Sequence, residues 1–301
     1  MKTTDVLIIG GSAAGMVTAL TGKAHWPNKE FILVKKHKEV MVPCGIPYIF
    51  GTLDGIDKNL MPVDASVGKA GITSLVDEAT EIDTNNKVVT FASGEKISYK
   101  KLVLATGSTP YKPNWLPGVD LDNVFVILKD KSYLENLKNK LNTLKNIVVV
   151  GAGFIGVEVA DELAKQGHKV TIVEKLPYIL NLAFDPEISE KIHEMLVKRG
   201  VNIITGNGIS KITGSKKVES IELEDGQKLE VDAVILSMGY RPNSELAKKS
   251  GIYVDEDNFI AVDEYMRTHV KDVFAVGDCA QRRDFVTRRR VPTMLASTSC
   301  A

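Results

Sequence analysis

The chain has 301 residues, of which 44% are hydrophobic and 25% are charged, and its 38 Lys and Arg residues balance 38 Asp and Glu residues. This length predicts two hydrophobic cores, and the balanced charge argues against nucleic acid as a partner. No apolar stretch reaches membrane-spanning length and no signal pattern precedes the first strand, so we expect a cytoplasmic protein without a membrane partner.

The first predicted elements are a buried strand at residues 6–9, a glycine turn, a helix with small residues, and a second strand at residues 31–36. Strands and a proline-rich stretch around residues 110–117 then predict a crossing between domains. A strand at residues 147–150, a helix at 154–165 and a strand at 169–174 repeat the first plan. A hairpin around residues 225–226 follows. The duplication predicts an α/β fold with two Rossmann-like dinucleotide-binding domains, the second inserted in the first.

The second glycine turn carries Gly151, Gly153 and Gly156, a spacing that lets backbone N–H groups approach a pyrophosphate at a helix N-terminus. Glu174 ends the following strand, where a carboxylate can accept hydrogen bonds from an adenosine ribose and repel a 2′-phosphate. This pattern favours NADH, with NADPH as the alternative. Taken alone, such a turn could also belong to another α/β sheet.

The first glycine turn is less regular. Gly10, Ser12 and Gly15 hold the three turn positions, and Lys35 stands where an acidic ribose ligand is expected. A lysine cannot accept hydrogen bonds from ribose hydroxyls. Either a neighbour such as Glu39 substitutes, or the adenosine end is held differently.

Two further motifs join these turns: Ala105-Thr106-Gly107 after a strand, and Val276-Gly277-Asp278 near the end of the chain. With them the sequence resembles the FAD- and NAD(P)-dependent pyridine nucleotide-disulfide oxidoreductases over essentially its whole length. The resemblance implies that the first turn binds FAD, that the second binds NAD(P)H, and that Asp278 contacts the ribityl chain of the flavin. It also implies that Glu158 lies near the nicotinamide and that Phe154 gates its pocket, although both could be ordinary helix residues. The predicted cofactor-binding residues are Gly10, Ser12, Ala14, Gly15, Lys35, Ala105, Thr106, Gly107, Gly151, Gly153, Phe154, Ile155, Gly156, Glu158, Glu174, Gly239, Gly277 and Asp278.

Cys44 is the predicted catalytic residue. It precedes Gly45, Pro47 and an expected helix containing Tyr48, and a helix N-terminus favours the thiolate. The stretch resembles the Cys-Gly-Leu-Pro-Tyr motif of the single-cysteine branch, which comprises coenzyme A disulfide reductases, NADH oxidases, NADH peroxidases and persulfide or polysulfide reductases. Ile49 stands where the branch with a redox disulfide has its second cysteine. Cys44 would therefore cycle as a mixed disulfide, a persulfide or a sulfenic acid.

Ala13 helps to choose within this branch, because peroxidase and oxidase members carry a histidine at that position. Disulfide or persulfide substrates therefore rank above peroxide. Three cysteines, Cys44, Cys279 and Cys300, show no CxxC spacing, and the five histidines show no ligand spacing, so we expect no metal site.

Five arginines, Arg282, Arg283, Arg288, Arg289 and Arg290, form a basic cluster near the end of the chain. A solvated loop is the usual meaning of such a run. The functional alternative is a landing site for an anionic thiol such as coenzyme A.

The expected domains are residues 1–110 with 245–301 for FAD, and residues 111–244 for NAD(P)H. Relatives continue with a dimerisation domain, and we expect this chain to lack it through truncation. The full-length protein would be a homodimer, whereas this chain should lose the usual dimer.

In the expected reaction, NAD(P)H reduces FAD, and the electrons pass through Cys44 to a small disulfide or persulfide. Alternatives are an NADH oxidase with oxygen as substrate, an electron-transfer reductase like ferredoxin or rubredoxin reductases, and a nucleotide sensor without turnover. The sequence leaves the physiological electron acceptor open.

Overall fold

The computed structural model describes residues 1–284 and 286–287. The chain forms two compact α/β units built on parallel sheets, which confirms the predicted fold class. Unit 1 contains Met1–Pro43, Leu60–Thr109 and Arg241–Ala301, whereas unit 2 contains Cys44–Asn59 and Pro110–Tyr240. The expected division had placed residues 44–59 in the first domain and had ended the inserted domain at residue 244.

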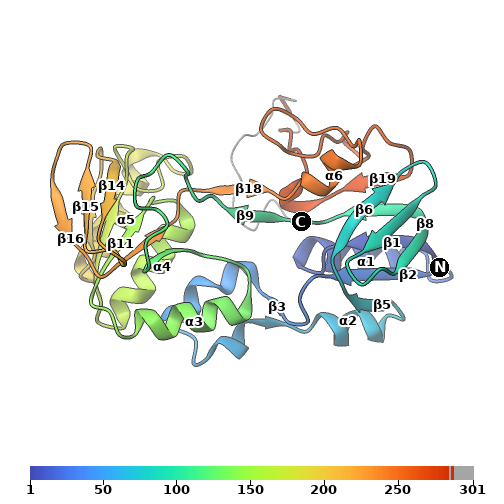
Figure 1. Cartoon of the computed structure of the whole chain (residues 1–301), viewed down its shortest axis with the longest axis horizontal. Coiled ribbons are helices and arrows are strands. Elements are labelled where there is room, and N and C mark those ends of the chain that lie inside the picture. Colours follow the sequence, from blue (N-terminus) through green and yellow to red (C-terminus); the bar gives the residue numbers. More distant parts are fainter. Residues whose placement is uncertain (285, 288–301) are drawn as a thin grey trace. The chain divides into compact units, whose positions relative to one another are not determined.

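Unit 1 is built on a seven-stranded sheet (Figure 1). Its elements are β1 (Lys2–Ile9), α1 (Ala13–His25), β2 (Phe31–Lys35), β3 (Val40–Met41), β4 (Leu60–Met61), α2 (Val63–Lys69), β5 (Thr73–Val76), β6 (Ala79–Asp83), β7 (Val88–Phe91), β8 (Lys96–Leu104), α6 (Glu245–Lys249), β19 (Val273–Ala275) and the 3₁₀ helix η4 (Gly277–Cys279). The strand order is β5-β2-β1-β8-β7-β6, with β19 also paired to β8. Strands β5, β2, β1, β8 and β19 run parallel, and β6 and β7 form an antiparallel extension.

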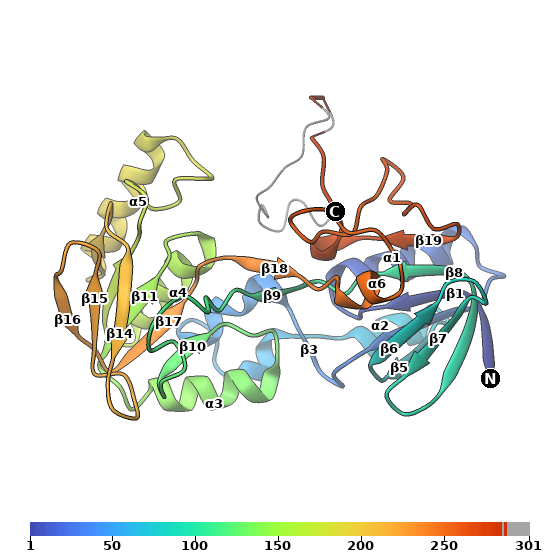
Figure 2. The ribbon, with the colours of Figure 1, turned by 45° about the horizontal axis from the view of Figure 1, so that its top comes forward.

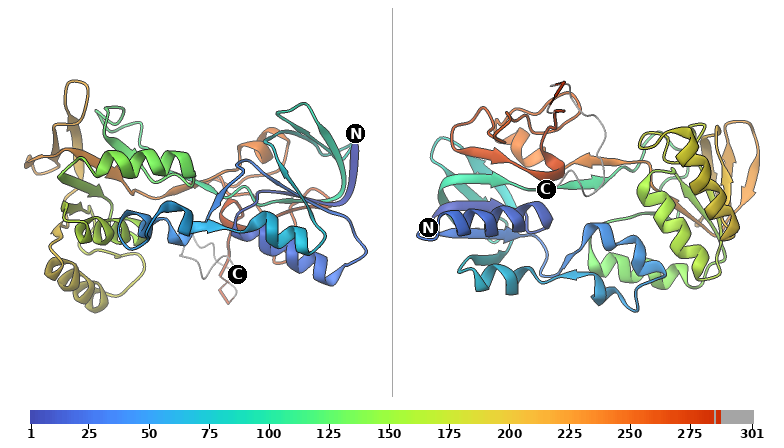
Figure 3. Two further views of the ribbon diagram at one scale, coloured as in Figure 1. Left: turned by 90° about the horizontal axis from the view of Figure 1, so that it is seen from below. Right: turned by 180° about the vertical axis from the view of Figure 1, so that it is seen from behind.

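Alternation along β1 divides the core of unit 1 into two layers, because successive side chains of a strand point to opposite faces. Leu7 and Ile9 pack with side chains of β6, β7 and β19. Ile8 faces the other way, toward Ala19 of α1 and Val67 of α2. Helices α1 and α2 therefore cover one face of this sheet (Figure 3). The carboxyl ends of its parallel strands meet at one edge, where the first glycine turn lies.

Unit 2 has a five-stranded parallel sheet in the order β10-β17-β11-β12-β13. Its elements are the 3₁₀ helices η2 (Pro47–Phe50) and η3 (Ile56–Asn59), β10 (Val124–Val126), α3 (Lys131–Leu141), β11 (Asn146–Val150), α4 (Phe154–Lys165), β12 (Lys169–Val173), α5 (Pro186–Lys198), β13 (Asn202–Ile204), β14 (Ile209–Thr213), β15 (Ser220–Leu223), β16 (Lys228–Glu230) and β17 (Ala233–Leu236). Strands β14, β15 and β16 form a separate antiparallel layer beside this sheet (Figure 2). Val148 and Val150 of β11 pack against that layer, and α4 packs against β11 and β12.

The chain passes between the units after residues 43, 59, 109 and 240. The last two crossings fall in two paired strands, β9 (Ser108–Pro110) and β18 (Tyr240–Pro242). The crossing in β9 is the one that the prolines predicted. No helix among the described residues is long and apolar enough to cross a membrane.

The predicted helix at residues 154–165 and the hairpin around residues 225–226 are present. The predicted helix after Cys44 is instead a series of short 3₁₀ turns, of which η1 (Pro43–Gly45) contains the cysteine. Two prolines within five residues account for this, because proline lacks the N–H that an α-helix needs. The predicted helix at the end of the chain lies outside the described residues.

Candidate functional site

The second glycine turn joins β11 to α4 in unit 2. Gly151 has a φ of 98°, and a Cβ built on it would lie 2.5 Å from the carbonyl oxygen of Ser237. A Cβ on Gly156 would collide with the carbonyl oxygen of Gly151. Both glycines are therefore required by the fold itself, one for the backbone conformation and one for the close approach of helix and strand.

Gly153 is different, because nothing within the chain requires a glycine there. Its φ of −71° and ψ of −178° suit any residue. A Cβ built on it would meet no atom within 4 Å. It is the N-cap of α4 and is exposed. The space over this helix N-terminus is thus open to an anionic ligand that approaches the backbone closely.

Glu174 follows β12 directly and turns back to the glycine turn. Its carboxylate accepts hydrogen bonds from the backbone N–H of Ala152 at 2.6 Å and of Leu176 at 2.8 Å. The predicted ribose ligand thus also braces the turn. Each carboxylate oxygen keeps acceptor capacity beyond these two bonds.

The first turns of α4 carry three other predicted residues. Phe154 lies edge-to-face against Phe184, with ring centroids 5.8 Å apart. Ile155 and Glu158 are half-buried. Burial and then the nearby Glu162 carboxylate raise the pKa of Glu158. Gly239, which follows β17, has a φ of 98° and open space at its Cβ position.

The first glycine turn joins β1 to α1 in unit 1 and repeats this geometry. Gly10 has a φ of 119°, and a Cβ there would collide with the carbonyl oxygen of Ala105. A Cβ on Gly15 would collide with the carbonyl oxygen of Gly10. Ser12 is the N-cap of α1 but makes no side-chain capping bond. Its hydroxyl can therefore serve a ligand at the turn.

The fold brings the late Gly277-Asp278 motif to the same turn. Gly277 has a φ of 74°, and a Cβ on it would lie 2.7 Å from the Cβ of Ala14 in α1. Asp278 accepts a hydrogen bond from Ser108 Oγ at 2.8 Å and pairs with Arg282 at 3.2 Å.

The Ala105-Thr106-Gly107 motif lies at the same edge of the sheet of unit 1. Thr106 Oγ1 donates to the carbonyl oxygen of Asn243 at 2.6 Å, and the backbone N–H of Asn243 donates to the carbonyl oxygen of Gly107 at 2.9 Å. The predicted FAD residues of unit 1 thus converge on the carboxyl ends of β1 and β8.

The basic cluster is described only in part. Arg282 pairs with Asp278, and Arg283 Nη2 donates to Gln281 at 3.4 Å. Arg288, Arg289 and Arg290 lie outside the described residues, as does Cys300.

The two described cysteines have opposite surroundings. Cys44 is exposed, whereas Cys279 is buried in η4. The Cys279 thiol donates toward the carbonyl oxygens of Leu104 and Val276, and burial raises its pKa. Cys279 is therefore a poor nucleophile and Cys44 is the accessible thiol.

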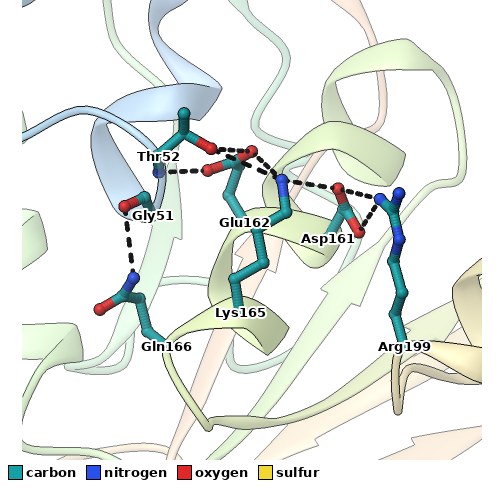
Figure 4. A network of polar contacts seen from close by, with 7 residues as sticks. All are labelled: Gly51, Thr52, Asp161, Glu162, Lys165, Gln166 and Arg199. Carbon is teal, nitrogen blue, oxygen red and sulfur yellow. Dashed lines mark hydrogen bonds and ion pairs between the residues drawn. The ribbon is translucent and has the colours of Figure 1, made fainter.

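A polar network around the buried Glu162 carboxylate ties the segment Cys44–Asn59 to helix α4 (Figure 4). Glu162 is 1% exposed and accepts hydrogen bonds from Thr52, from N–H at 2.5 Å and Oγ1 at 2.9 Å. Lys165 Nζ lies 2.6 Å from Glu162 Oε1 and 3.1 Å from Asp161 Oδ2. Both carboxylate oxygens of Asp161 also accept hydrogen bonds from Arg199. The same helix thus carries Glu158 and holds the segment that begins with Cys44.

Sequence reasoning did not identify Glu162, Thr52, Phe184, Ser108 or Asp64, which pairs with Lys35. Of these five residues, only Glu162 could have been recognised from the sequence. It lies seven residues after Ile155 and three after Val159, on the apolar side of α4, where an unpaired carboxylate would be costly.

Two glycine turns between a parallel strand and a helix, one in each unit, define a protein with two Rossmann-type dinucleotide-binding units. The family model for pyridine nucleotide-disulphide oxidoreductases matches residues 4–298, and the chain belongs to this family.

Individual relatives agree with this assignment. The chain is 35% identical to an NADH oxidase of Methanocaldococcus jannaschii, covering 93% of this chain and 64% of the relative. It is 36% identical to an NAD(P)H coenzyme A polysulfide/persulfide reductase of Pyrococcus horikoshii, covering 97% and 66%. The chain thus spans about two thirds of these relatives. A solved NAD-dependent persulfide reductase from A. fulgidus aligns with a TM-score of 0.86 at 30% identity, covering 95% of this chain and 55% of that one.

Proposed function

We propose that the protein is an FAD-dependent NAD(P)H oxidoreductase that reduces a small disulfide or persulfide through Cys44. The observation that carries the proposal is the combination of two glycine turns with the exposed thiol of Cys44, on a segment bound to the helix of the second turn. The names of the Pyrococcus and A. fulgidus relatives support the sulfur substrate.

Both cofactors fit the residues present. The open space over Gly153 and the unused hydroxyl of Ser12 suit pyrophosphate groups at the two helix N-termini. Unit 2 would hold NAD(P)H through its glycine turn and Glu174, and unit 1 would hold FAD through Gly10, Ser12 and Asp278. FAD, when bound, accepts a hydride from NAD(P)H and makes its electron pair available to sulfur.

Cys44 would perform the sulfur chemistry. Its thiolate attacks one sulfur of a disulfide RSSR, forms a mixed disulfide and releases one RS⁻. Two electrons then cleave the mixed disulfide, which restores the Cys44 thiolate and releases the second RS⁻. Protons from solvent complete the balance NAD(P)H + H⁺ + RSSR → NAD(P)⁺ + 2 RSH.

Oxygen reduction is the second candidate, because the Methanocaldococcus relative is named an NADH oxidase. The two functions differ in product, since one releases thiol and the other consumes oxygen. An electron-transfer reductase would need no cysteine. Measurements of thiol release, oxygen consumption and dependence on Cys44 therefore distinguish the disulfide reductase, the oxidase and the electron-transfer reductase.

The test uses the flavin-loaded protein with NADH and with NADPH, in anaerobic buffer except in the reaction to which oxygen is added. Coenzyme A disulfide, polysulfide and oxygen are offered in parallel. For Cys44→Ser we expect bleaching of the flavin by NADH to persist while thiol release stops. Cys279→Ala is the matched control and should retain thiol release, because that cysteine is buried. Thiol release by Cys44→Ser at the wild-type rate would refute the proposal, and failure of NADH to bleach the flavin would refute its first half.

A further inference from the structure

The end of β2 holds a buried lysine at the position where dinucleotide-binding units usually place a carboxylate. Lys35 is 2% exposed, and a Cβ built on Gly11 would lie 2.6 Å from its Cβ. Its aliphatic stem therefore packs under the first glycine turn. Its ammonium group donates to Asp64 Oδ2 at 2.9 Å and to the carbonyl oxygen of Lys38. The positive charge of Lys35 is thus paired with Asp64 at the start of α2.

A pocket of about 150 Å³ lies beside this ion pair. Residues of the loop after β2 form one wall, and residues around the start of α2 form the other. Its charged side chains are Lys35, Lys38, Glu39 and Asp64. All four belong to unit 1, and Lys35 packs against Gly11 of the first glycine turn.

The Asp64 carboxylate is fixed in place in this pocket by two hydrogen bonds. Its Oδ1 accepts a bond from Ser74 Oγ at 2.7 Å, and its Oδ2 accepts the bond from Lys35. These bonds, that of Lys35 first, lower its pKa, so it is ionised and only accepts hydrogen bonds at neutral pH. Its side chain is 58% exposed, and an ionised carboxylate has about four acceptor positions, so it can accept from a ligand as well.

We propose that Asp64, held by Lys35, accepts the hydrogen bonds of the adenosine ribose hydroxyls of FAD. The inference rests on the proposed function, because it assumes that unit 1 binds FAD. Lys35 occupies the usual place of the ribose acceptor but cannot accept hydrogen bonds. Its ion pair holds the carboxylate of Asp64 from α2 next to this place. Lys35 is therefore a positioning residue, and Asp64 a binding residue.

The experiment pairs a change in the protein with a change in the ligand. The deflavinated chain is titrated with FAD and with an FAD analogue that carries 2′,3′-dideoxyadenosine, and Kd is measured by flavin fluorescence. The wild-type chain should bind FAD about 10-fold or more tightly than the analogue, as expected for hydrogen bonds to a charged group. Asp64→Asn should weaken FAD binding and reduce this discrimination to about 3-fold or less. Glu39→Gln, which removes the other carboxylate of the pocket, should discriminate as the wild type does.

Asp64→Asn leaves the buried Lys35 without its ion pair, so the double variant Lys35→Met/Asp64→Asn guards against unfolding. It should fold, as judged by its thermal transition, and show no discrimination. Full discrimination in either Asp64 variant, its loss in Glu39→Gln, or its absence in the wild type would overturn the inference. A wild-type chain that does not bind FAD at all would instead refute the proposed function.

Discussion

At the residue scale, one glycine of the second turn should matter for nucleotide binding and another for stability. Gly153→Ala places a methyl group in open space, so the free energy of unfolding should change little, whereas NADH affinity should fall about 10-fold or more because the methyl group blocks the backbone. Gly156→Ala meets the Gly151 carbonyl and should cost about 1–3 kcal/mol of stability. Thermal unfolding and NADH titration of both variants test this. Equal losses of stability in Gly153→Ala and Gly156→Ala would contradict this prediction.

A second residue-scale prediction concerns Glu158. Burial, followed by repulsion from Glu162, raises its pKa, so its ionisation weakens the folded state. This penalty is absent below the unfolded pKa near 4.5 and grows as pH rises through the folded pKa. Glu158→Gln should therefore unfold at a higher temperature than the wild type at pH 8, with the difference vanishing at pH 4. A constant difference across this range would show that ionisation of Glu158 is not its cause.

The residue scale also shows what the sequence can predict. Gly10, Gly15, Gly151 and Gly156 were found from spacing alone. The positive φ of Gly10 and Gly151 and the close approach of Gly15 and Gly156 to those residues arise within one strand-turn-helix unit. The roles of Asp64 and Glu162 arise from partners 29 and 110 residues away. No local pattern encodes such pairs.

At the element scale, helix α4 carries the segment Cys44–Asn59 through Glu162. Glu162→Gln should cost about 1–3 kcal/mol, because Lys165 loses its buried anion and Thr52 its charged acceptor. Local opening of the segment should increase about 10-fold or more, measured by hydrogen exchange of peptides covering residues 47–55.

Asp161→Asn is the matched control for this prediction. It changes a neighbouring carboxylate of the same helix, which pairs with Arg199 and Lys165 rather than with the segment. Exchange of residues 47–55 should stay near the wild-type rate in this variant. Equal exchange in both variants would mean that Glu162 does not anchor the segment.

Elements were predicted well where a pattern repeats and poorly where prolines interrupt it. The helix at residues 154–165 was placed correctly, since its apolar spacing is helical throughout. The turns around Cys44 became 3₁₀ helices, because Pro43 and Pro47 leave too few backbone donors for an α-helix.

At the scale of the whole molecule, each unit should take a single cofactor. FAD should slow hydrogen exchange at residues 10–15 of unit 1, and NADH should do so at residues 151–156 of unit 2, because bound pyrophosphate covers the N–H groups of its own turn. Hydrogen-exchange mass spectrometry with each nucleotide alone provides the measurement. Protection of both turns by one nucleotide, or the reverse assignment, would contradict this division.

Unit 2 is assembled from two separate stretches of chain, which limits how it can be recombined. Cutting at the paired crossings β9 and β18 would transplant residues 110–240 without Cys44–Asn59. The buried Ile49 and Phe50 would then stay behind in the donor chain, and Glu162 would lose Thr52. A chimera between family members should therefore exchange both stretches together, so a replacement of the second glycine turn also replaces the stretch that carries Cys44.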